Sequence, residues 1–371
     1  MDNTTILKKI LKRQFHKKPT IFLWKIYITF QIFLNCLINF SKKYPKLFYA
    51  GARQGDKGGP MVKIQKLNNF FPEHRFNFNI IYLLSNSIYL NNSAINLIKK
   101  KSLPVILNQN GVFYPAWFEG DWQKQNLRMS KIYHLADYVL WQSYFCKRTS
   151  EKFLGKRMGK GEVLYNAVDT SFFVPTKDSN NSRFTFLVTG NIRKKSNYRI
   201  TSLLYALKET LRENKNICLK IAGYIEDEKY LFSKINELNL SEHIDFLKNF
   251  TQKDAPKIYQ QADAYITMSY QDNCPTAVIE AMACGLPILY SKSGGTPELV
   301  DKNSGVGLKV SGNWKKIKVP GKYEISNGMK EIIENKINMS EASRIRATEF
   351  FDIKKWILRH NSIFEESLEK I

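Results

Sequence analysis

Two carboxylates in the C-terminal half stand where a helix start would present them to a ligand. Asp272 and Glu280 bracket the start of an apolar run, and Pro275 lies between them. Asp is preferred just before a helix, proline fits the first turn, and a following glycine and proline end it, so we expect a helix over residues 276–284. A strand predicted over residues 264–268 precedes it. A helix start after a strand offers free N–H groups and a positive dipole end to an anion.

Glu280 is the more informative of the two acids. The predicted helix is apolar on nearly every face, which indicates burial, because Glu280 is surrounded by Ala277, Val278, Ile279, Ala281 and Met282. A buried carboxylate without a partner is costly. Two explanations stay open: a ligand that donates hydroxyl groups to Glu280, or a core carboxylate paired with a nearby lysine or arginine.

A second loop-to-helix transition follows shortly afterwards. Gly294 and Gly295 precede a new predicted helix that begins near Thr296. Glycines let the backbone approach a ligand closely. Two such anion sites in succession are stronger evidence for a phosphate-bearing ligand than either one alone.

These motifs resemble those of a known enzyme family. The run from Asp272 to Glu280 resembles the E-x7-E region of family-4 retaining glycosyltransferases, and residues 294–298 resemble their G-G-x-P-E motif. The resemblance extends from about residue 47 to the C-terminus and is strongest over 259–300. It implies an α/β fold of two Rossmann-like domains with parallel sheets, the GT-B architecture, with a donor cleft between them. It also implies a nucleotide-diphosphate sugar as the donor substrate.

The resemblance implies a role for each part of the donor site. Glu280 would hold the ribose hydroxyls, and Asp272, where the family more often has Glu, would face the donor sugar near the reaction centre. Backbone groups of the helix start would meet the sugar or its phosphate. The other donor-binding candidates are Pro275, Thr276, Ala277, Gly294, Gly295 and Thr296.

A basic loop supplies candidate cations for the diphosphate. Similar enzymes place an arginine and a lysine after the first strand of the second domain, where preorganised cations meet the charge on the departing nucleotide. Arg193 is the candidate arginine, and Lys195 and Arg199 are both candidates for the lysine. A solvated basic loop is the alternative. The sequence has no Asp-x-Asp metal motif, so we expect a metal-independent reaction without a cofactor.

The first domain carries the remaining candidates. Gly58 and Gly59 lie in a glycine-rich loop that, by resemblance, closes over the donor phosphate. After the third predicted strand, at the edge where ligands bind α/β sheets, lie the acceptor-pocket candidates Asn110, Tyr114, Trp117 and Asp121. Many family members carry a histidine near Asn110. The lack of an evident general base is compatible with retention, because the leaving phosphate can then accept the proton of the acceptor hydroxyl.

Short apolar runs between longer mixed segments predict the frame that positions these residues. Buried strands separated by helices indicate parallel sheets. The predicted strands are 47–52, 79–84, 104–107, 138–141, 184–189, 217–222, 244–247, 264–268 and 286–290. The predicted divisions are a basic amphipathic segment (1–44), an acceptor domain (45–168), a donor-binding domain (169–350) and a C-terminal helix that returns to the first domain (351–371).

The N-terminal segment is locally basic and then aromatic. Residues 1–46 hold ten Lys or Arg and one acid, Asp2. Residues 20–40 are apolar but interrupted, which weakens the case for a membrane-spanning helix. Gln31, Asn35 and Asn39 recur every four residues and share one helical face. Two alternatives stay open: a helix at an anionic membrane surface, or a helix packed on its own domain.

Composition limits the classes of partner. The net charge is +24, and the five cysteines form no C-x-x-C pair, which argues against disulfides or a zinc site and is typical of a reducing cytosol. The charge favours anionic partners, although an A+T-rich genome would also enrich lysine. The sequence shows no recognisable nucleic-acid module, so nucleic acid is not an expected partner.

The leading hypothesis is therefore a retaining glycosyltransferase. It would move a sugar from a nucleotide-diphosphate sugar to a glycan or lipid-linked acceptor, in surface polysaccharide or lipopolysaccharide assembly. We expect it in the cytoplasm, with peripheral attachment to the inner face of the cytoplasmic membrane as a further possibility. A nucleotide-sugar epimerase on the same fold is the alternative, and a basic nucleic-acid-binding protein is an alternative from another class.

Overall fold

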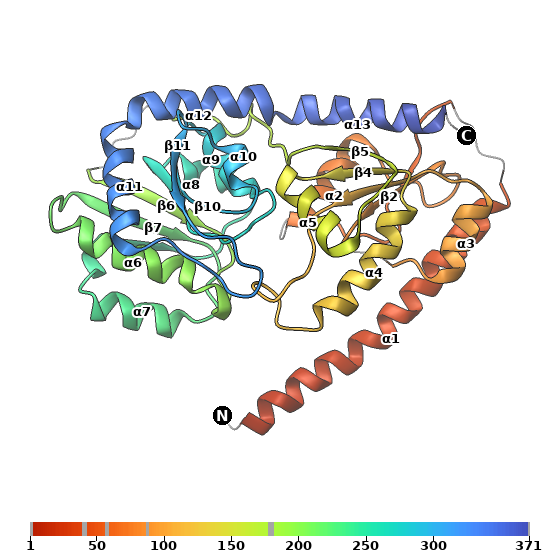
Figure 1. Ribbon diagram of the computed structural model, residues 1–371, viewed down its shortest axis with the longest axis horizontal. Coiled ribbons are helices and arrows are strands. Elements are labelled where there is room, and N and C mark those ends of the chain that lie inside the picture. Colours follow the sequence, from red (N-terminus) through yellow and green to blue (C-terminus); the bar gives the residue numbers. More distant parts are fainter. Residues whose placement is uncertain (1–2, 39–42, 56–58, 87–88, 177–181, 370–371) are drawn as a thin grey trace.

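Two α/β domains lie side by side in the computed structural model, each built on a parallel sheet (Figure 1). The structure describes residues 3–38, 43–55, 59–86, 89–176 and 182–369, with side chains from residue 20 onward. The N-terminal sheet has the order β1-β2-β3-β4-β5, and the C-terminal sheet has the order β11-β10-β9-β6-β7-β8. The prediction of two parallel-sheet α/β domains is confirmed.

Apolar side chains cover both faces of each sheet, as expected for strands that are buried between helices. The strands are β1 (Leu47–Phe48), β2 (Ile80–Leu84), β3 (Val105–Gln109), β4 (Tyr138–Trp141), β5 (Lys160–Val163), β6 (Phe184–Thr189), β7 (Ile217–Ala222), β8 (Ile244–Leu247), β9 (Ala264–Thr267), β10 (Ile288–Lys292) and β11 (Gly305–Lys309). The sequence did not predict the edge strands β5 and β11. β5 is only half-buried and lacks an apolar run, and β11 begins Gly-Val-Gly, so neither shows the signature of a central strand.

Most of the helices lie between successive strands, and the last ones follow the final strand. They are α2 (Gly59–Phe70), α3 (Asn92–Lys100), α4 (Trp122–Leu135), α5 (Tyr144–Leu154), α6 (Tyr198–Thr210), α7 (Glu228–Glu237), α8 (Ala255–Tyr259), α9 (Thr276–Ala283), α10 (Thr296–Leu299), α11 (Lys322–Glu334), α12 (Lys336–Phe350) and α13 (Ile353–Leu368). Helix α9 ends one residue before its predicted end.

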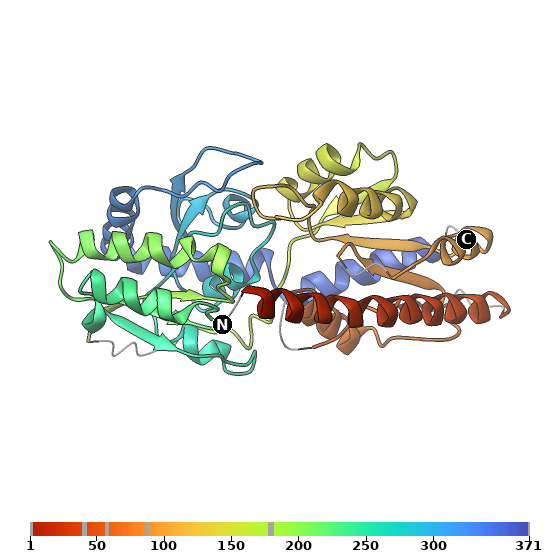
Figure 2. The same cartoon turned by 90° about the horizontal axis from the view of Figure 1, so that it is seen from below.

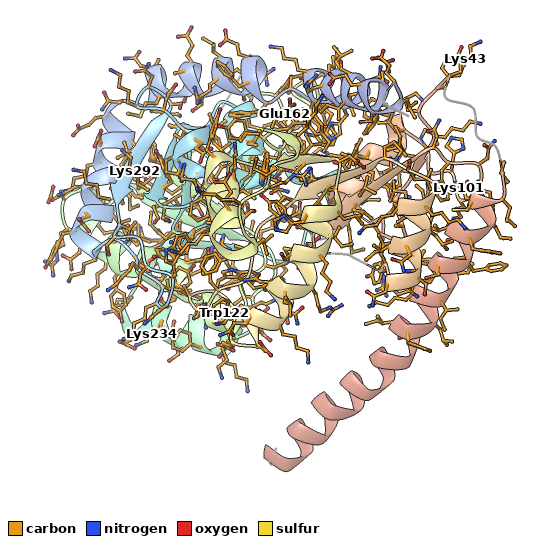
Figure 3. The ribbon with its side chains drawn as sticks, turned by 45° about the vertical axis from the view of Figure 1, so that its right-hand side comes forward. Lys43, Lys101, Trp122, Glu162, Lys234 and Lys292 are labelled. Atoms are coloured by element: carbon orange, nitrogen blue, oxygen red, sulfur yellow. The ribbon has the colours of Figure 1, made fainter. Side chains whose placement is uncertain are left out.

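Helices α12 and α13 run along one edge of both domains, so the chain ends on the N-terminal domain (Figure 1). Trp356 and Phe364 of α13 are buried in the core that lies against β1 and β2. Glu162 of β5 lies close to this helix (Figure 3) and accepts two hydrogen bonds from Arg359, at 2.8 and 2.7 Å. This paired geometry between guanidinium and carboxylate fixes the position of α13 over the sheet.

Helix α1 (Asn3–Cys36) is a long rod, and its N-terminal half extends beyond the domain body (Figures 1 and 2). Its C-terminal half packs against α3 through Ile28, Ile32 and Cys36. The polar stripe also faces inward, because Gln31 and Asn35 are buried. The Asn35 amide exchanges two hydrogen bonds of 2.9 Å with the backbone of Phe78. Asn39 lies outside the described residues.

The opposite face of α1 is apolar and exposed. It carries Phe22, Leu23, Ile26, Tyr27, Phe30 and Phe33, while Ile21 and Trp24 are exposed on the side toward the domain and Leu37 and Ile38 follow the end of the helix. The polar residues that share one helical face thus anchor the helix to its domain, and the aromatic residues stay uncovered. Among the described residues, no helix is long and apolar enough to cross a membrane.

Candidate functional site

Two cavities lie between the domains, at the carboxyl ends of the strands, where α/β sheets bind ligands. The first, here called the Glu280 cavity, has a volume of about 280 Å³ and is lined by α2 from one domain and by α9 and the end of β6 from the other. The second, here called the Asp272 cavity, has a volume of about 340 Å³ and is lined by the loop after β3 and by the loop after β9. Each cavity therefore takes its walls from both domains.

Glu280 is buried in the wall of the first cavity, at 8% exposure. Its carboxylate accepts hydrogen bonds from the Gln252 amide at 2.7 Å and from the Tyr259 hydroxyl at 2.9 Å. Burial raises the pKa of Glu280, and the charge of Lys66 opposes this rise. The carboxylate is thus neither paired with a described lysine or arginine at hydrogen-bond distance nor left without donors, because two neutral side chains already donate to it. Each oxygen keeps a lone pair that could accept from a ligand hydroxyl.

The start of helix α9 faces the same cavity. Thr276 and Ala277 line it together with Glu280, whereas Pro275 precedes the helix as its N-cap and is not among the lining residues. The free N–H groups of this first turn and the positive end of the helix dipole favour a phosphate there. Gly59 at the start of α2 lines the opposite wall. Gly58 lies outside the described residues.

Two lysines of α2 that the sequence did not single out supply the positive charge of this cavity. Lys63 is buried and donates hydrogen bonds to the side-chain oxygens of Asn108 at 3.0 Å and Asn110 at 3.5 Å. Burial lowers the pKa of Lys63 to about 8. Lys66 donates to the Ala167 carbonyl at 3.3 Å, and burial lowers its pKa while Glu280 opposes the change. In the sequence, Lys63 and Lys66 stand three residues apart after a glycine-rich loop, and this spacing, which places both on one helical face, could have indicated them.

The basic loop after β6 lies at the edge of the two cavities. Arg193 is exposed and lines neither of them, so its place at the diphosphate stays a prediction. Lys195 is also exposed and donates to the Trp117 carbonyl across the domain boundary at 2.8 Å. Arg199 alone of the three lines a cavity, and it is the Asp272 cavity.

Asp272 opens into the second cavity rather than the first. Its carboxylate accepts a hydrogen bond from the Cys274 N–H at 3.2 Å and thereby fixes the turn before α9. Asp272 is exposed to the cavity, yet the surrounding protein atoms raise its pKa, whereas this hydrogen bond and the charge of Arg199 lower it. The two acids of the motif therefore face different cavities, which are separated by the start of α9.

The glycine pair packs against the turn that carries Asp272. Gly294 has a φ of +70°, and a Cβ on Gly294 or Gly295 would overlap the backbone of the Asp272–Asn273 turn. The Gly295 N–H also donates to the Asp272 carbonyl at 2.7 Å. Gly294, Gly295 and the buried Thr296 line neither cavity, so their contact with the donor stays a prediction.

Of the four acceptor-pocket candidates, Asn110 and Trp117 line the Asp272 cavity. The other two do not. Tyr114 is buried against Trp314 and Phe153, and Asp121 is exposed and caps α4 by accepting from the Lys124 N–H at 2.9 Å. The ligand contacts of these two residues stay predictions.

Asn110 connects the two cavities. It lines the Asp272 cavity, and its side-chain oxygen accepts from Lys63 of the Glu280 cavity and from Gln142. Next to it, Gly111 has a φ of +140°, and a Cβ there would overlap the Asn273 side chain of the other domain. Through this contact the loop after β3 packs against the turn that carries Asp272. A sugar lying between the cavities would meet Lys63, Asn110 and Asp272.

Comparison with known proteins gives a family match over the C-terminal domain. Residues 170–348 match the family model described as glycosyl transferases group 1. Over 190 residues the chain is 25% identical to spore coat protein SA of Bacillus subtilis (strain 168), covering 45% of this chain and 49% of that protein. Over 83 residues it is 31% identical to D-inositol 3-phosphate glycosyltransferase of Mycobacterium sp. (strain KMS), covering 22% and 19%. The chain thus spans half or less of the length of these curated relatives.

Solved structures show that the similarity in fold extends over both domains. Anabaena HepE in complex with UDP and glucose superposes with a TM-score of 0.62 at 18% identity, covering 84% of this chain and 82% of that chain. Sucrose-phosphate synthase from Thermosynechococcus elongatus gives a TM-score of 0.64 at 15% identity, covering 85% and 83%. Identities this low show the fold, which is GT-B. Within the described part of the chain, no group of three His, Cys, Asp or Glu side chains is placed to hold a metal ion.

Proposed function

We propose that this protein is a retaining glycosyltransferase that moves a sugar from a nucleotide-diphosphate sugar to a glycan or lipid-linked acceptor. The observation that carries the proposal is the Glu280 cavity. In it a buried carboxylate, the start of α9 and two lysines surround one space. A nucleotide-diphosphate sugar fits this set, because ribose hydroxyls donate to carboxylates and phosphates bind cations and helix starts. HepE, a protein of the same fold, has a solved structure in complex with UDP and glucose, which supports this donor class.

Lys63 and Lys66 are the proposed partners of the diphosphate. Negative charge develops on the leaving nucleotide as the sugar bond breaks, and fixed cations stabilise that charge. The two lysines project from the acceptor domain, so the diphosphate would be neutralised from the opposite side of the cleft to α9. Arg199, one cavity away, would lie nearer the transferred sugar. With these cations in place, we propose a reaction that needs no metal and no cofactor.

We propose retention, with the acceptor hydroxyl reaching the sugar on the face from which the phosphate departs. The acceptor hydroxyl would enter through the Asp272 cavity, with Asn110 and Trp117 at its walls. In a retaining reaction the departing phosphate accepts the proton of that hydroxyl, and Asp272 would orient the hydroxyl without removing its proton. An inverting reaction would instead require Asp272 as the general base. Proton NMR of the first-formed product distinguishes the two, since retention of the donor's anomeric configuration is expected and inversion would contradict the proposal.

We also propose that α1 places the enzyme on an anionic membrane surface, as surface polysaccharide or lipopolysaccharide assembly would require. The exposed apolar face of residues 22–33 suits the boundary between head groups and acyl chains, and the basic residues 8–18 suit anionic lipids. Co-sedimentation with vesicles of phosphatidylglycerol and phosphatidylcholine tests this. The wild type should pellet, and Phe22→Ser with Phe30→Ser should reduce the pelleted fraction. Equal pelleting of the two proteins would contradict the attachment.

The donor site is tested by nucleotide binding. A thermal-shift screen of UDP-, GDP- and ADP-sugars selects the donor, because a ligand of the folded state raises the midpoint. Glu280→Ala should then raise the Kd for the selected nucleotide sugar by about tenfold or more. The matched control is Glu334→Ala, an exposed carboxylate on α11. An unchanged affinity in Glu280→Ala, or no nucleotide binding by the wild type, would refute the proposal. Release of an epimerised nucleotide sugar without an acceptor would favour the epimerase instead.

A further inference from the structure

A third cavity lies beneath α1, outside the two described above. This α1 cavity has a volume of about 490 Å³, within the range of small-molecule sites. Helices α1, α3 and α4 supply its walls. Its charged lining residues are Lys25 of α1 and Arg128 and Lys131 of α4, and none of the residues that line it is an acid.

The three cations have no carboxylate partner in the described part of the chain. None of them takes part in an ion pair there. The charge of Arg128 also acts unfavourably on Lys25, whose pKa is lowered by burial first and by Arg128 second. Like charges gathered at a cavity without a counter-charge repel one another, and an anionic ligand would relieve that repulsion.

The location of the cavity indicates which anion it would take. Ser85, Asn86, Phe113 and Met129 line both the α1 cavity and the Asp272 cavity, so these two spaces are adjacent. On its other side the α1 cavity is bounded by Ile21 and Lys25, beside the exposed apolar face of α1. A molecule in the α1 cavity therefore reaches toward the proposed acceptor site at one end and toward the proposed membrane surface at the other.

We propose that the α1 cavity binds the phosphate or diphosphate of a lipid-linked acceptor. Its lipid chain would run along the apolar face of α1, its phosphate would contact Lys25, Arg128 and Lys131, and its sugar would enter the Asp272 cavity. This inference rests on the proposed function and narrows it, because it selects a lipid-linked acceptor over a free glycan. A free phosphate shares the same chemistry with the cations but would make no use of the apolar face.

Farnesyl diphosphate is a suitable probe, because it is a short lipid diphosphate. Inorganic pyrophosphate tests the charge alone, and farnesol tests the apolar part alone. The test variant is Arg128→Gln with Lys131→Gln, which removes two exposed cations of the cavity. The matched control is Lys100→Gln with Lys124→Gln, which removes two exposed cations of α3 and α4 that do not line it. Calorimetry measures the Kd of each probe, and UDP is titrated into every variant in parallel.

The wild type should bind farnesyl diphosphate more tightly than either pyrophosphate or farnesol. The Kd for farnesyl diphosphate should rise about tenfold or more in the test variant and stay within about twofold in the control. UDP affinity should be equal in all three proteins. Equal farnesyl diphosphate affinity in test and control variants, or pyrophosphate binding as tight as that of farnesyl diphosphate, would overturn the inference. If UDP binds normally while farnesyl diphosphate fails, only this inference falls; if UDP does not bind the wild type, the proposed function falls with it.

Discussion

We predict that the affinity for a nucleotide diphosphate falls as the pH rises, because the buried Lys63 loses its charge. Burial lowers its pKa to about 8, so in the empty site its charged form is present below that pH and is lost as the pH rises through it. A diphosphate binds the charged form. From a pKa of about 8, roughly 90% of Lys63 is charged at pH 7 and roughly 10% at pH 9. Because apparent affinity scales with the fraction of competent protein, the Kd should rise about tenfold between these pH values.

Isothermal titration of UDP at pH 7, 8 and 9 measures this change, and Lys63→Met is the comparison. The variant removes the titrating amine and keeps a side chain of similar length, so its UDP affinity should be lower at pH 7 and change little with pH. Ionisation of UDP itself affects both proteins alike and cancels in the comparison. The reasoning is refuted if the wild-type Kd is the same at pH 7 and 9, or if Lys63→Met keeps the full tenfold change.

Three further outcomes follow from the packing around the site. Gly295→Ala should lower the free energy of unfolding by about 1–3 kcal/mol, because its Cβ would overlap the Asn273 carbonyl. Gly312→Ala is the control, since a Cβ there has no neighbour within 4 Å and should leave the thermal midpoint unchanged. Equal midpoints of the two variants would contradict this. Asn35→Ala should cost about 2 kcal/mol or more by leaving the Phe78 backbone unpaired, and limited proteolysis should then cleave near α1 faster than in the wild type. Arg193→Ala should leave sugar transfer within about twofold, whereas Arg199→Ala should slow it about tenfold or more; the reverse order would restore Arg193 to the site.

The fold was largely predictable because buried strands can be recognised in the sequence as short apolar runs. The central strands β6 and β7 of the C-terminal sheet appear within the predicted limits, and α9 begins at the predicted residue. The edge strands β5 and β11 were missed, whereas the edge strands β1 and β8 were predicted, since an edge strand needs neither two buried faces nor a continuous apolar stretch. In α1, helical periodicity correctly grouped Gln31 with Asn35 but could not tell which face was inside. That depends on the unpaired backbone of Phe78, which is distant in sequence and holds Asn35 by hydrogen bonds.

The site was predictable where one segment carries both the residue and its surroundings. The apolar neighbours of Glu280 in α9 are enough to predict its burial, and the structure places it in a cavity with Thr276 and Ala277. Gly294 and Gly295 show the limit of such reasoning. A glycine allows close approach, but sequence does not say whether a ligand or the protein's own backbone comes close, and here the partner is the Asp272–Asn273 turn.

The cations show why a local motif could not complete the donor site. The basic loop after β6 offered Arg193 with either Lys195 or Arg199, whereas the cations that line the Glu280 cavity are Lys63 and Lys66 of the other domain. These lysines stand close to Glu280 only because the two domains face each other across the cleft. If they neutralise the diphosphate, its binding energy depends on the distance between the domains, and the nucleotide would itself favour the closed arrangement. The acceptor loop at Asn110, which bonds to Lys63, would then be fixed when the donor binds.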